Sequence, residues 1–134
     1  MAALILDASV LIGLLDRADA HHDDAVETVE LADQAGRELA TPASAYSEAL
    51  VAFARIDRLG DARDAISGMG IQVTPMGASI AERAAALRAT HGALRLPDAI
   101  VLATALELRG ELMTYDQRLA TYAGVQAGGA DPPP

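Results

Sequence analysis

Short apolar runs alternate along this chain with stretches of helical periodicity, and this alternation restricts the fold more than any other feature. Four runs have the length and apolar character of buried strands: residues 3–6, 38–41, 71–74 and 112–114. Strands that alternate with helices indicate a parallel sheet covered by helices on both faces. We therefore expect an α/β fold, a three-layer domain with a central, mainly parallel sheet of four or five strands. The fifth would be a weak strand near Val125.

Seven segments between and after these strands have the spacing of helices. They are residues 10–15, 22–35, 42–57, 61–69, 79–90, 97–109 and 117–122. Thr41 is expected as the N-cap of the third helix, with Pro42 at its first position. Two helices in succession separate the last two strands, so either the link 91–96 returns the chain or the helix from Ser79 lies across the layer. The sequence leaves both arrangements open.

The chain has 134 residues, a length typical of one domain, which we assign to residues 1–126. The tail A-G-G-A-D-P-P-P, residues 127–134, is expected to be disordered. The absence of cysteine excludes disulfides and thiolate metal sites. No apolar run approaches the roughly 18 residues of a membrane span, and the start lacks the basic segment of a signal peptide. We expect a soluble cytoplasmic protein without membrane contact.

The net charge is -9, and all ten basic residues are arginines. Such an acidic chain is a poor non-specific nucleic-acid binder, because phosphate neutralisation supplies most of that affinity. If the protein handles nucleic acid, a divalent cation or a few local arginines must hold it. Arg95, three residues before Asp98, and Arg118, two residues after Asp116, are the candidates for binding nucleic acid.

Four acids are placed where the carboxyl ends of the strands should lie. Asp7 and Asp116 follow the first and fourth strands, Glu48 lies within two turns of the start of the third helix, and Asp98 is in the first turn of the 97–109 helix. In open parallel sheets, ligands bind beyond the carboxyl ends of the strands. We therefore expect Asp7, Glu48, Asp98 and Asp116 to converge.

Clustered carboxylates repel one another unless a proton, an arginine or a cation neutralises them. Hard oxygen ligands suit Mg²⁺, for which Mn²⁺ can substitute, and such an ion supports phosphodiester hydrolysis. Each acid also has an ordinary interpretation. Asp7 and Asp116 could be helix caps, Asp98 could complement a helix dipole, and Glu48 could be solvated. Ser9 and Thr114 could orient Asp7 and Asp116, or serve as ordinary cap or strand-end hydroxyls.

The adjacent pair His21 and His22 could suggest a metal site or a general base. Neighbouring residues of a helix point in different directions, and two aspartates follow, so we interpret the pair as a polar helix start.

Four motifs in order resemble the PIN-domain ribonucleases, most closely the toxins of VapBC-type toxin–antitoxin pairs. They are I-L-D-A-S-V-L-I, Y-S-E-A-L, L-R-L-P-D-A-I-V-L-A-T-A and L-M-T-Y-D-Q-R-L-A, and they span residues 4–120. The resemblance implies a metal-dependent endoribonuclease in which Asp7, Glu48, Asp98 and Asp116 match the acidic set. Ser9 and Thr114 match its recurrent hydroxyl positions. Many relatives carry a further acid after the last one, whereas Gln117 follows here, so the number of metal ions stays open.

The resemblance further implies a homodimer and a cognate antitoxin whose basic tail blocks the site. We expect the dimer to form through apolar helix faces such as those beginning at His22 and Pro42. The expected role of Asp7, Asp98 and Asp116 is to hold Mg²⁺, with Glu48 as a ligand, an outer-shell ligand or a base. Two alternatives are a catalytically silent PIN-like binding module and a haloacid-dehalogenase-type phosphatase. The phosphatase requires a second Asp where this chain has Ser9.

Overall fold

A four-stranded parallel sheet forms the centre of the molecule. The computed structural model describes residues 1–126, and the tail for which disorder is expected lies outside them. The strands are β1 (Leu4–Leu6), β2 (Leu39–Pro42), β3 (Ile71–Thr74) and β4 (Glu111–Met113), in the order β3-β2-β1-β4. Every neighbouring pair is parallel. The carboxyl ends of all four strands therefore share one edge of the sheet.

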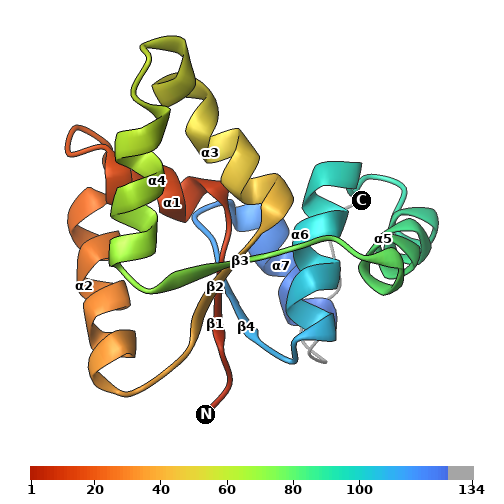
Figure 1. Ribbon diagram of the computed structural model, residues 1–134. Coiled ribbons are helices and arrows are strands. Elements are labelled where there is room, and N and C mark those ends of the chain that lie inside the picture. Colours follow the sequence, from red (N-terminus) through yellow and green to blue (C-terminus); the bar gives the residue numbers. More distant parts are fainter. Residues whose placement is uncertain (127–134) are drawn as a thin grey trace.

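Helices cover both faces of this sheet. They are α1 (Ala8–Leu15), α2 (His22–Gln34), α3 (Ala43–Arg55), α4 (Leu59–Gly68), α5 (Ala78–Thr90), α6 (Leu96–Glu107) and α7 (Gln117–Gln126). Figure 1 shows α1, α2 and α4 on one side and α5, α6 and α7 on the other. Two aliphatic clusters fill the layers, and α3 contributes to both, with Leu50 in one and Ala45 in the other. The three-layer α/β architecture expected from the sequence is confirmed.

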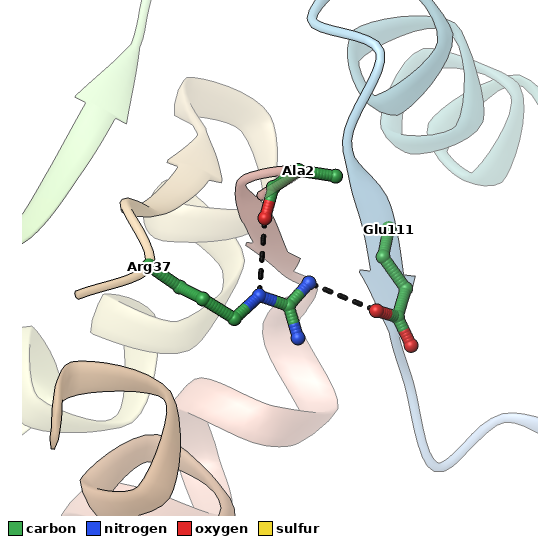
Figure 2. Close-up of polar contacts among 3 residues, drawn as sticks. All are labelled: Ala2, Arg37 and Glu111. Atoms are coloured by element: carbon green, nitrogen blue, oxygen red, sulfur yellow. Dashed lines mark hydrogen bonds and ion pairs between the residues drawn. The ribbon is translucent and has the colours of Figure 1, made fainter. Parts of the chain in front are cut away.

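One arginine links three segments at the amino edge of the sheet. The Nε of Arg37 donates to the carbonyl of Ala2 at 3.0 Å, and its Nη2 donates to Glu111 at 2.8 Å (Figure 2). Arg37 thereby ties the segment before β2 to those that begin β1 and β4. Gly110 lies against the same edge, where a Cβ would stand 2.6 Å from the Cγ1 of Ile5. The segments at this edge are therefore packed so closely that Gly110 has no room for a side chain.

Helices α5 and α6 form an antiparallel pair, which resolves the question that the sequence left open. The Oγ of Ser79, at the start of α5, donates to Glu107 at the end of α6 at 3.0 Å. Arg83 pairs with the same carboxylate at 2.8 Å. The link from His91 to Arg95 joins their other ends, so it is this link that returns the chain. Helix α6 consequently begins at the carboxyl edge of the sheet.

Two sequence expectations are wrong. Val125 is part of α7 and not of a fifth strand, so the described residues contain four strands. Thr41 does not cap α3, because it still belongs to β2 and its buried Oγ1 donates to the carbonyl of Leu6 at 2.7 Å. Pro42 occupies the N-cap position instead. Within residues 1–126, no helix combines the length and apolar character that crossing a bilayer requires.

Candidate active site

Asp7 is the most firmly held of the four acids. It follows β1 and caps α1, where its Oδ1 accepts from the Val10 amide at 3.1 Å and from the Ser9 hydroxyl at 2.6 Å. Its Oδ2 accepts a hydrogen bond from the Thr114 hydroxyl. The side chain is buried. The two hydroxyls and the helix amide compensate for the burial of the carboxylate, so its orientation is fixed.

Asp116 is positioned by the turn that follows β4. Its amide donates to the Thr114 hydroxyl at 3.0 Å, and its Oδ1 accepts from the amides of Arg118 at 2.9 Å and Leu119 at 3.2 Å. The carboxylate therefore caps α7. Thr114 bonds both aspartates, which connects the ends of β1 and β4.

Asp98 lies in the first turn of α6, and its surroundings act on its charge in opposing ways. Burial raises the pKa of the carboxyl above its ordinary value of 3.8, and the charges of Asp116 and Asp7 raise it further. The guanidinium of Arg95, with its Nε 3.6 Å from Oδ2, opposes them. Arg95 itself is 77% exposed and Asp98 is 25% exposed. The ion pair is therefore long and mostly solvated on the arginine side.

All four predicted acids line one cavity of about 160 Å³ at the carboxyl edge. Glu48 reaches it from the second turn of α3. The other polar residues of its wall are Asp7, Ser9, Ser44, Arg95, Asp98 and Asp116. Ser44, one turn before Glu48, was not predicted. Among the described residues, its hydroxyl oxygen is buried without a hydrogen-bond partner, so a polar ligand in the cavity could satisfy it.

The donors of this cavity suit a small hard cation. Carboxylate and hydroxyl oxygens are the ligands that Mg²⁺ prefers, and Mg²⁺ commonly binds through one or two carboxylates while keeping several waters. As the side chains of residues 1–124 stand, no three acidic or histidine side chains lie close enough to enclose an ion together. One oxygen of Asp98 faces Arg95 at 3.6 Å, so we expect this carboxylate to turn from the arginine if it binds an ion directly. The oxygen donors of the cavity therefore fit Mg²⁺, and water molecules would supply the remaining ligands.

A second cavity of about 230 Å³ adjoins the first, because Asp98 and Asp116 line both. The two arginines predicted to bind RNA, Arg95 and Arg118, line it as well. A larger hollow of about 490 Å³ lies along the outer edge of β4. Its charged residues, Arg37 and Glu111, are already paired, so we do not assign chemistry to it.

A further contact at this edge was not predicted from the sequence. Tyr115, between Thr114 and Asp116, donates from its hydroxyl to Asp24 at 2.6 Å, and its ring stacks on His21. Burial and the Asp24 carboxylate raise the pKa of this tyrosine. Its position between two predicted site residues is the signal that could have identified it.

Comparisons with known proteins agree with this architecture. The sequence model of the PIN domain matches residues 4–125. A solved chain described as a toxin–antitoxin complex from Klebsiella pneumoniae is similar with a TM-score of 0.71 and 28% identity, covering 87% of this chain and 88% of that one. Mycobacterium tuberculosis VapC20, a sarcin–ricin loop cleaving toxin, has a TM-score of 0.69 at 16% identity, with 96% and 97% covered. The latter is a likeness of fold alone. No curated protein matches the sequence.

Proposed function

This chain belongs to the PIN domain family, and we propose that it is a magnesium-dependent endoribonuclease, the toxin of a type II toxin–antitoxin pair in the cytoplasm. The convergence of four acids on one cavity carries the proposal. The similarity to a chain from a toxin–antitoxin complex supports the toxin class. A catalytically silent binding module is less favoured, because all four acids are present. The family match likewise favours a nuclease over a phosphatase of the haloacid-dehalogenase type.

The residues take distinct roles in the proposed reaction. Asp7, Asp98 and Asp116 would hold Mg²⁺, directly or through water. When bound there, the ion supplies a Lewis acid for a phosphoryl oxygen and lowers the pKa of a water molecule. Ser9 and Thr114 fix the orientation of Asp7. Glu48, which is exposed at the same cavity, orients the attacking water or binds the ion through water.

RNA is held by few contacts in this proposal. Arg95 and Arg118 line the second cavity and are placed to contact phosphates beside the acids. A protein that neutralises about three phosphates of single-stranded RNA should show a log–log salt slope of magnitude about 2, at about 0.7 per phosphate. A slope steeper than about 5 would mean many contacts and would contradict this part of the proposal.

The antitoxin is proposed to cover the groove of about 270 Å³ that runs from Glu48 between α1 and α3. Ile12 and Ile56 line the groove and are 37% and 64% exposed. An apolar segment of the antitoxin fits this lining, and its basic tail complements the acids beyond Glu48. Ile12→Asp should weaken antitoxin binding, whereas Leu108→Asp, at an exposed position after α6, should not. Equal affinity of both variants and the wild type would contradict this placement.

A homodimer is part of the same proposal. Leu31 on α2 and Val51 on α3 are 58% and 43% exposed, which leaves apolar surface for a second copy. Light scattering at micromolar concentration should give twice the chain mass. A monomer under those conditions would contradict the dimer.

The ends of the RNA products test the proposed chemistry. Attack by water predicts cleavage that requires Mg²⁺, stops on chelation and leaves no 2′,3′-cyclic phosphate, because the 2′-hydroxyl is not the nucleophile. Glu48→Gln should slow cleavage, while Glu82→Gln, an exposed acid on α5, should not. Cleavage that persists in chelator, or cyclic phosphate ends, would overturn the proposal.

A further inference from the structure

A parallel stack of two rings includes Tyr115, whose amide donates to Ser9 in the wall of the acidic cavity. The imidazole of His21 lies over the phenol ring of Tyr115 with centroids 4.0 Å apart and an interplanar angle of 4°. His21 immediately precedes α2, and Tyr115 joins Thr114 to Asp116 after β4. The stack therefore connects two segments distant in sequence, and one of them carries residues of the candidate site.

Tyr115 is fixed from several directions. Its amide donates to the Ser9 hydroxyl at 3.1 Å, and its own hydroxyl donates to Asp24 at 2.6 Å. Its ring also packs against the aliphatic cluster under α1 and α2. Because Ser9 also bonds Asp7, the position of the phenol ring is set relative to the acids. The fixed Tyr115 ring supports the imidazole of His21 that stacks on it, which lowers the entropy cost when a ligand stacks on His21.

His21 is the exposed member of the stack. Tyr115 covers one face of its imidazole, while the residue as a whole is exposed. The opposite face and the ring edge are therefore the sides from which a ligand can approach. The residue occupies the N-cap position of α2 but makes no capping hydrogen bond through its side chain. Its amide, by contrast, donates to Asp19 at 2.9 Å. Capping by the side chain therefore does not explain the orientation of the ring.

The charge around the stack selects the kind of ligand. Asp19 and Asp24 flank it, and the whole chain carries a net charge of -9, so a phosphate is repelled there. A nucleobase is uncharged and has a π-face that stacks on aromatic side chains, as in many proteins that bind single-stranded RNA. Stacking gives an acidic protein a hold on RNA that does not depend on positive charge.

We propose that the His21–Tyr115 stack is a docking platform for an unpaired base of the RNA substrate, next to the bond cut at the acids. The ligand class rests on the proposed ribonuclease function, whereas the platform itself rests on the ring geometry. The backbone of that nucleotide passes toward Asp7 and Asp116. Its base lies on the outer face of His21.

Binding of a fluorescent single-stranded RNA of mixed sequence tests the platform. Anisotropy is measured in Ca²⁺, which takes the same oxygen ligands, beside an RNA of equal length that lacks bases. His21→Ala should weaken binding of the normal RNA about tenfold, as expected for the loss of one stacked base. Binding of the abasic RNA and the salt slope should not change. His21→Phe should restore affinity, whereas His21→Lys should not.

The matched control is the neighbouring histidine. The Nδ1 of His22 lies 2.7 Å from the carbonyl of Gly13, so His22→Ala should lower the melting temperature but leave RNA affinity unchanged. Wild-type affinity in His21→Ala, or equal rescue by lysine and phenylalanine, would overturn the platform. If the wild type cleaves RNA in Mg²⁺ while His21→Ala binds normally, the platform fails and the nuclease stands. Base-dependent binding that His21→Ala weakens, without cleavage by the wild type, would support the platform and overturn the nuclease.

Discussion

At the amino edge of the sheet, the charged side chains of Arg37 and Glu111 satisfy each other at 2.8 Å (Figure 2). At the carboxyl edge of the same sheet, Asp7, Asp98 and Asp116 face one cavity, and Arg95 reaches Asp98 only at 3.6 Å. The two edges differ in what they bring together. At the amino edge, the segments that begin the strands pack closely against one another. The carboxyl edge, by contrast, gathers the loops that begin α1, α6 and α7.

We therefore expect the amino edge to contribute to stability and the carboxyl edge to contribute to function. In the Arg37–Glu111 pair the arginine is 19% exposed and the glutamate is 66% exposed. A pair that reaches the surface in this way contributes about 1 kcal/mol, and its removal should not affect RNA cleavage. Burial first, and then the charges of Asp116 and Asp7, raise the pKa of Asp98, so its ionised carboxylate opposes folding. Such an arrangement is typical of a site that binds cations. Substitutions at the two edges should therefore have opposite consequences.

Asp98→Asn should have the largest effect on activity. The amide keeps the shape of the side chain but removes the charge, so RNA cleavage should fall more than about 100-fold, beyond the loss typical of outer-shell groups. The melting temperature should hold or rise, because one repelling charge is gone. Cleavage rates in Mg²⁺ and thermal melts of the same preparation measure both.

Glu111→Gln is the matched control at the amino edge. It removes the same charge from the exposed side of an ion pair, and the amide can still accept from Arg37. Cleavage should therefore not change, and stability should fall by about 1 kcal/mol or less. Full activity in Asp98→Asn, or equal losses of activity in both variants, would break the distinction between the edges.

Gly110→Ala should produce the largest loss of stability at the amino edge. The added Cβ would lie 2.6 Å from the Cγ1 of Ile5 and 3.0 Å from the carbonyl oxygen of Ala3, so the strands must shift. Overpacking of this kind costs about 1–3 kcal/mol. Urea denaturation should show it. Gly68→Ala is the control, since its Cβ meets nothing within 4 Å, and it should be neutral or stabilising. Equal stability of both variants would contradict the packing at Gly110.

The smallest predicted effect is the pH dependence of the stability gained by Asp98→Asn. A carboxyl whose pKa is higher in the folded state than its unfolded value of 3.8 makes the wild type less stable as the pH rises through that interval. The advantage of the asparagine variant should thus be full at neutral pH and shrink toward about pH 4. Unfolding free energies at several pH values measure it. A variant less stable than the wild type at neutral pH would contradict the sign.

The sequence was sufficient to predict that the acids would converge, because in a parallel sheet a residue that follows a strand and one that begins a returning helix meet at the same edge. Asp7, Asp98 and Asp116 are placed by that rule alone. It does not place contacts between distant segments, such as Tyr115 with His21 and Asp24, since these depend on side-chain packing. Val125 was misassigned because a short apolar stretch fits a strand and a helix end equally well.

Anomalous diffraction from crystals soaked in Mn²⁺ tests most directly whether the carboxyl edge is a cation site. We predict a peak among Asp7, Asp98 and Asp116, with ligand distances near about 2.1 Å and the Asp98 carboxylate turned away from Arg95. No peak at millimolar Mn²⁺, with Asp98 still paired to Arg95, would contradict it.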